Sequence, residues 1–86
     1  MPWRVALSSR ARRDRASLSA TDRAAVDAAL RHLADDPSSV DFKKLAGGSR
    51  IWRLRVGRWR ALLDLDSRVG LMTVTRILDR REAYRG

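Results

Sequence analysis

The chain has 86 residues, 44% of them hydrophobic, with 19 basic and 10 acidic side chains and a formal net charge of +9. This length predicts one domain over residues 1–86, with a single modest core. The absence of cysteine excludes disulfides and thiolate metal sites. No apolar stretch has the length of a membrane span, and the opening MPWRVALSSRARR lacks the pattern of a signal peptide, so a cytoplasmic location is expected.

The basic residues are concentrated in the second half of the chain. Residues 1–36 contain seven basic and five acidic side chains, a net charge of +2, whereas residues 37–86 contain twelve and five, a net charge of +7. Seventeen of the nineteen basic residues are arginine, whose planar guanidinium suits bidentate contact with phosphate. A genome biased toward arginine codons would explain the total but not this placement.

The first elements are expected to be a strand and a helix. Apolar and other residues alternate over residues 3–7, which predicts a short strand. Ser8 or Ser9 can cap a helix that extends to about Leu18 and is rich in arginine.

A second helix follows. Ser19 with Asp22 three residues later is a weak capping-box signal. The apolar residues after it have the spacing of one buried helical face: Ala25, Val26, Ala29, Leu30 and Leu33. Pro37 ends the helix, because the residue before a proline disfavours the helical conformation. Residues 38–49 are predicted to be a basic loop.

Residues 51–65, IWRLRVGRWRALLDL, predict a tight β-hairpin with alternating faces. A two-residue type II′ turn beginning at Gly57 would place Arg55 opposite Arg60, on a face that the apolar core does not use. Like charges paired in this way cost up to about 1 kcal/mol, so an anionic partner is expected there. Trp52 and Trp59 fall on the apolar side and are expected to pack in the core. Arg58, in the turn, is expected to face solvent only.

A closing strand is predicted over residues 71–78, followed by DRREAYRG at the end of the chain. The resulting element order is β-α-α-β-β-β. The order and spacing resemble the RelE/ParE superfamily of toxins from bacterial toxin–antitoxin pairs. The segments that carry the resemblance are SSRARRDRASL, DDPSSVDFKKLAGG, WRLRVGRWRALLDL and DRREAYR.

The resemblance runs from Trp3 to Tyr84 and implies an α+β fold, an antiparallel sheet of about four strands with two helices packed on one face. It also implies a cognate acidic antitoxin as partner, in a toxin–antitoxin hetero-oligomer. The RelE branch of the superfamily cleaves mRNA in the ribosomal A site, which makes the ribosome and mRNA further partners. The ParE branch inhibits DNA gyrase.

RelE-like ribonucleases gather basic residues on the sheet and near the chain end. The positions that match here are candidate catalytic residues: Arg53, Arg55, Arg60, Arg80, Arg81 and Tyr84. By this resemblance, the arginines stabilise charge on a phosphate attacked by a ribose 2′-hydroxyl. Tyr84 would stack on a base or accept a proton. Lys43 and Lys44 are candidates for holding ribosomal RNA or gyrase, and no cofactor or metal is expected.

Some residues depart from the best-understood RelE pattern. Arg53 and Arg55 replace lysines, and arginine is too basic to accept a proton at neutral pH. Asp79 stands where relatives often have histidine. Two alternatives therefore stay open. One is a ParE-like gyrase inhibitor, and the other is a non-enzymatic basic module that only binds nucleic acid.

Overall fold

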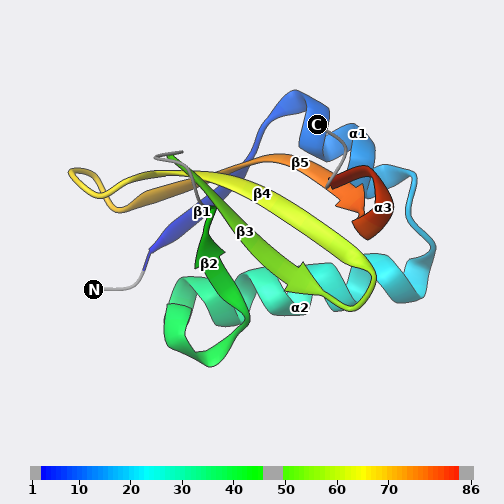
Figure 1. The fold of residues 1–86 in the computed structure, drawn as a ribbon, viewed down its shortest axis with the longest axis horizontal. Helices are drawn as coiled ribbons and strands as arrows, with labels where there is room; N and C mark the ends of the chain where they lie inside the picture. Colours follow the sequence, from blue (N-terminus) through cyan, green and yellow to red (C-terminus); the bar gives the residue numbers. More distant parts are fainter. Residues whose placement is uncertain (1–2, 46–49, 84–86) are drawn as a thin grey trace.

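The computed structural model describes residues 3–45 and 50–83. Its strands form one sheet in the order β1-β5-β4-β3-β2 (Figure 1). The strands are β1 (Arg4–Leu7), β2 (Phe42–Lys44), β3 (Ile51–Val56), β4 (Trp59–Asp66) and β5 (Leu71–Asp79). The helices are α1 (Ser9–Ala16), α2 (Ala20–Asp35), a 3-10 turn η1 (Pro37–Ser39) and α3 (Arg80–Ala83). The predicted α+β class is confirmed. None of these helices is long and apolar enough to cross a membrane.

Both long helices begin at the predicted kind of cap. The Ser8 hydroxyl accepts the Ala11 N–H at 3.1 Å, and α1 starts at the next residue. The Ser19 hydroxyl accepts the Asp22 N–H at 3.1 Å at the start of α2. Each bond satisfies one of the N–H groups that a helix leaves without a partner at its first turn.

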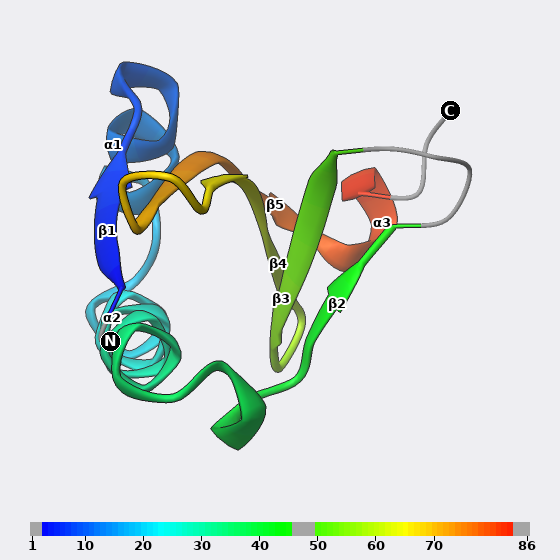
Figure 2. The same cartoon turned by 90° about the vertical axis from the view of Figure 1, so that its left-hand side faces the viewer.

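The core lies between the two long helices and one face of the sheet. Figure 2 shows α1 and α2 together on one side of β3, β4 and β5. The buried apolar residues are Ala11, Leu18, Val26, Leu30, Leu33, Leu54, Ala61, Leu63, Met72, Val74 and Ile77. Trp52 is half-buried, and Trp59 packs against this core as predicted. The apolar side of the hairpin is thus the side that the helices cover.

The sheet differs from the expectation in two ways. Residues 38–49 were predicted as a loop, but the described part of this range includes the end of η1 and the edge strand β2, which pairs antiparallel with β3. The Phe42 ring stacks on Trp52 with centroids 4.8 Å apart, and this contact helps to hold β2 in place. β1 pairs with β5 in parallel. The described sheet therefore has five strands, one of which is parallel to its neighbour.

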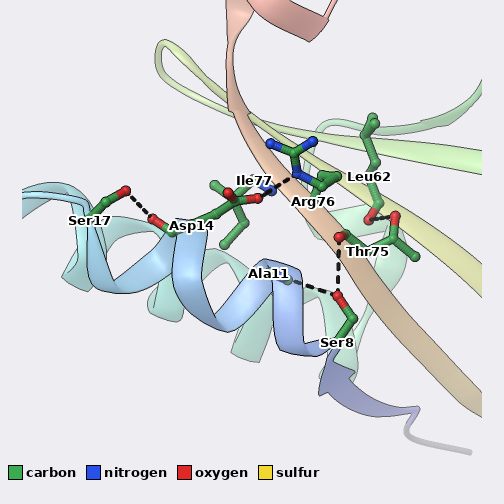
Figure 3. A network of polar contacts seen from close by, with 8 residues as sticks. All are labelled: Ser8, Ala11, Asp14, Ser17, Leu62, Thr75, Arg76 and Ile77. Carbon is green, nitrogen blue, oxygen red and sulfur yellow. Dashed lines mark hydrogen bonds and ion pairs between the residues drawn. The ribbon is translucent and has the colours of Figure 1, made fainter.

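Helix α1 is fixed to the part of β5 that β1 does not reach. The Asp14 carboxylate accepts hydrogen bonds from Arg76 Nε and the Ile77 N–H, both at 2.9 Å (Figure 3). The Ser8 hydroxyl donates to the Thr75 carbonyl at 3.1 Å. Burial raises the pKa of Asp14, but the bonds from Arg76 and Ile77 outweigh it, so the pKa lies below its usual value.

Candidate nucleic-acid interface

The hairpin has the predicted turn and register. Gly57 has a φ of +58°, and no described non-glycine residue has a positive φ, which is the pattern of a type II′ turn. Arg55 lies opposite Arg60, as predicted. Alternation and cross-strand pairing place five cationic residues on the sheet face opposite the core. We call this the arginine face: Lys43, Arg53, Arg55, Arg60 and Arg76.

Arg60 lies on the predicted face, but it is not exposed to solvent, although an anionic partner was expected to contact it there. Only 3% of the residue is accessible. Its Nη1 donates to the carbonyls of Gly57 and Trp59 at 2.7 and 2.8 Å, and its buried Nε has no hydrogen-bond partner among the described residues. A guanidinium bound only to neutral carbonyls is a costly buried charge. Its charge adds to the positive potential at its cross-strand neighbour Arg55.

A pocket of about 590 Å³ lies at the turn end of the hairpin. Its lining residues are Arg55, Gly57, Arg58, Asp79, Arg80 and Arg81. The Arg80 N–H donates to the Arg58 carbonyl at 2.7 Å, which joins the start of α3 to the turn. The structure therefore brings together three of the predicted catalytic arginines, from β3 and α3. Four arginines and one aspartate give this arginine pocket a strongly positive potential.

Sequence reasoning missed the pairing of Arg58 with Asp79. Arg58 donates from Nε at 2.8 Å and from Nη2 to the same oxygen of Asp79, which is 8% exposed. The Arg58 guanidinium also lies 5.4 Å from the centre of the Trp59 ring. The interpretation of Arg58 as a solvent-facing turn residue was therefore wrong, although 58% of its side chain is accessible.

Asp79 is ionised at neutral pH. The Arg81 N–H first, and then Arg58, lower the pKa of Asp79 below its ordinary value. A carboxylate with a lowered pKa is a weak proton acceptor. The groups that line the described pocket are thus suited to binding and stabilising negative charge rather than to moving protons.

The other predicted residues lie farther from the pocket. Arg53 forms an ion pair with Asp41 at 2.9 Å. Lys43 is the cross-strand neighbour of Arg53 and shares the arginine face, whereas Lys44 is paired with Trp52 and belongs to the opposite face. The two adjacent lysines are therefore not equivalent.

Tyr84, to which the resemblance gives a role in stacking or proton transfer, lies outside the described residues. Within residues 3–45 and 50–83, no group of three or more histidine, aspartate or glutamate side chains has the arrangement of a metal site.

Comparison with solved structures supports the resemblance of this chain to the RelE-like toxin superfamily. The chain matches a chain of the RelBE2 toxin–antitoxin complex from Mycobacterium tuberculosis with a TM-score of 0.80 and 28% identity, covering 93% of this chain and 100% of that one. It matches the archaeal RelE–RelB complex from Pyrococcus horikoshii with a TM-score of 0.78 and 19% identity, covering 93% and 97%.

A mutant of Escherichia coli RelE in the free state matches with a TM-score of 0.77 and 17% identity, covering 96% of this chain and 88% of that one. No protein-family model and no curated protein matches the sequence. The relationship is thus carried by the fold, and it agrees with the resemblance seen in the local sequence segments.

Proposed function

We propose that this chain is the toxin of a type II toxin–antitoxin pair and acts as a ribosome-dependent endoribonuclease on mRNA. The observation that carries the proposal is the arginine pocket beside the buried Arg60, on a fold similar to RelE. The positive charge of such a site favours an anionic ligand. The phosphate backbone of RNA provides one anion per nucleotide.

The proposed chemistry is an attack of a ribose 2′-hydroxyl on the adjacent phosphate. The 2′-oxygen loses its proton and bonds to phosphorus, the bond from phosphorus to the 5′-oxygen of the next nucleotide breaks, and that oxygen leaves with a proton, so the products are a 2′,3′-cyclic phosphate and a 5′-hydroxyl. Negative charge then increases on the phosphate oxygens, and Arg55, Arg80 and Arg81 line the pocket in which those oxygens would bind. Preorganised guanidinium groups stabilise that charge more in the transition state than in the ground state. Arg60 adds a second cation beside Arg55. Proton transfer belongs to groups outside this cluster, and Tyr84 keeps the role that the resemblance implies.

An acidic antitoxin is the expected partner that neutralises the chain. Several of the structural neighbours are complexes of a RelE toxin with a RelB antitoxin. A net charge of +9 favours a partner of opposite sign. The proposed target, the translating ribosome, places the chain in the cytoplasm.

The test adds the purified chain to three parallel reactions. Two measure cleavage of the same mRNA, with and without programmed ribosomes, and the third measures inhibition of DNA supercoiling by gyrase. We expect new mRNA 5′ ends only with ribosomes. Inhibition of gyrase without mRNA cleavage would replace the proposal with the ParE-like activity. Binding to ribosomes without either effect would leave only a nucleic-acid-binding module.

A further inference from the structure

We propose that Asp79 is a positioning residue of the arginine pocket, whose buried carboxylate holds Arg58 and the first turn of α3 where the pocket arginines can reach one phosphate. This inference rests on the proposed function, because it assumes that the ligand is the phosphate backbone of RNA. It adds a carboxylate to a site that otherwise consists of cations.

Asp79 lies where three elements meet: the end of β5, the start of α3 and the hairpin turn. One carboxylate oxygen accepts both hydrogen bonds from Arg58. The other accepts the Arg81 N–H at 3.0 Å and lies 3.7 Å from Arg81 Nε. An aspartate just before the first helical residue, bonded to an N–H two residues later, is a helix N-cap. One oxygen thus holds the hairpin turn through Arg58, and the other holds the first turn of α3 through Arg81.

Burial makes this arrangement rigid. Asp79 is 8% exposed, whereas 58% of the Arg58 side chain is accessible. An exposed arginine in a two-residue turn has many rotamers, and the pair with Asp79 removes that freedom before an anion arrives. Ligand binding then does not have to order Arg58, which is the advantage of preorganisation.

Because Asp79 is negatively charged, the direction in which anion affinity changes when this charge is removed tests the proposed role. A carboxylate in a cationic pocket repels phosphate, so if charge were its only contribution, removing it would tighten anion binding. If Asp79 positions Arg58 and α3, removing its charge weakens binding in spite of the more positive potential. The two roles therefore predict changes in opposite directions.

The experiment measures fluorescence anisotropy of a labelled single-stranded RNA whose riboses are 2′-O-methylated and resist cleavage. Asp79→Asn keeps an oxygen for the Arg81 N–H but loses the ion pair with Arg58. Asp66→Asn is the matched control, because it removes the same charge and an aspartate–arginine pair, with Arg68 at 3.4 Å. Asp66 is the last residue of β4, next to the β4–β5 turn and at the other end of the strand from the pocket (Figure 1).

We expect Asp79→Asn to bind about tenfold more weakly, the effect of losing one charge-assisted contact. The slope of log affinity against log salt should become shallower by about 0.7, as for the loss of one phosphate contact on a single strand. Asp66→Asn should bind like the parent or slightly tighter. Arg58→Ala should show the same loss as Asp79→Asn, and the double variant little more than either.

Asp79→Asn binding as tightly as the parent, or tighter, would overturn the inference, and so would fully additive losses in the double variant. If Asp79→Asn melts near the assay temperature, Arg58→Ala decides, and parent-like binding by that variant overturns the inference. A parent chain that does not bind this RNA overturns this inference, whereas the proposed function stands or falls separately with cleavage of mRNA on programmed ribosomes. Parent binding with an unaffected Asp79→Asn overturns this inference alone.

Discussion

Arg60 is a buried cation whose hydrogen bonds within the described part of the chain go to the neutral carbonyls of Gly57 and Trp59, and no described carboxylate pairs with it. Replacing an uncompensated buried charge with an apolar side chain of similar length is often neutral or stabilising. A fold optimised for stability alone would therefore not keep an arginine at this position. The proposed contribution of its charge to the binding of an anion at Arg55 gives a reason to keep it.

We predict that Arg60→Met abolishes mRNA cleavage while melting at the same temperature as the parent or a few degrees higher. Loss of one preorganised group that stabilises transition-state charge commonly lowers a rate by about 10² to 10³, and Arg60 would act in this way as a buried positive charge next to Arg55. Arg60→Ala should also be inactive but should melt lower, because it leaves a cavity. Thermal unfolding of the two variants beside a cleavage assay checks this. An active Arg60→Met would remove Arg60 from the site.

Asp14 gives a prediction on acid stability. Its pKa in the folded protein lies below the ordinary value of 3.8, so its contribution to stability is present above that value and is lost as the pH falls below it. Asp14→Asn should melt lower than the parent at neutral pH. It should also lose less stability than the parent between about pH 4 and pH 2.

Thermal unfolding across pH measures this difference. Asp35→Asn, at an exposed position at the end of α2, has the same change in charge and serves as the control. Parallel curves for the parent and Asp14→Asn would contradict the assigned role of Asp14 in docking α1 on β5.

At the scale of the elements, the hairpin was predictable because its evidence is local. Strict alternation and a glycine at a two-residue turn specify both the face and the register, and the structure has Arg55 opposite Arg60. The cap of α2 was predictable for the same reason. The pairing of β2 and the parallel pairing of β1 depend on contacts between distant residues, which no local pattern contains.

The position of Asp79 depends on a β-bulge in β5, which the predicted strand did not include. Leu63 pairs with Val74, but Leu62 pairs with Arg76, so Thr75 is an extra residue in β5. This bulge shifts the register by one residue and places Trp59 opposite Asp79. Without the extra residue, Trp59 would lie opposite Leu78 instead. The only local signal is the longer spacing between the apolar residues of β5 at this point.

The two lysines of β2 test whether the two faces of the sheet differ in their contribution to RNA binding. Lys43→Ala should weaken binding of the uncleavable RNA several-fold and reduce the salt slope by about 0.7, as expected for one phosphate contact. Lys44→Ala, one residue along on the opposite face, should change neither. Equal effects of the two substitutions would show that the lysines act only through net charge.

At the scale of the whole molecule, the charge asymmetry agrees with the architecture. The half of the chain with a net charge of +7 contains β2 to β5 and α3, and these elements form the arginine face and the arginine pocket. The opposite face of the sheet is buried against α1 and α2. The molecule thus separates the face that stabilises the fold from the face that is proposed to bind RNA.

The central claim is that the chain cuts mRNA during translation. Its most direct test is induction in cells followed by mapping of new RNA 5′ ends against reading frames, with Arg60→Met induced to the same level as a control. We predict that the parent produces new ends inside translated reading frames, in register with codons, and that Arg60→Met produces none. Growth arrest by the parent without new mRNA ends, accompanied by DNA breaks that depend on gyrase, would contradict the claim.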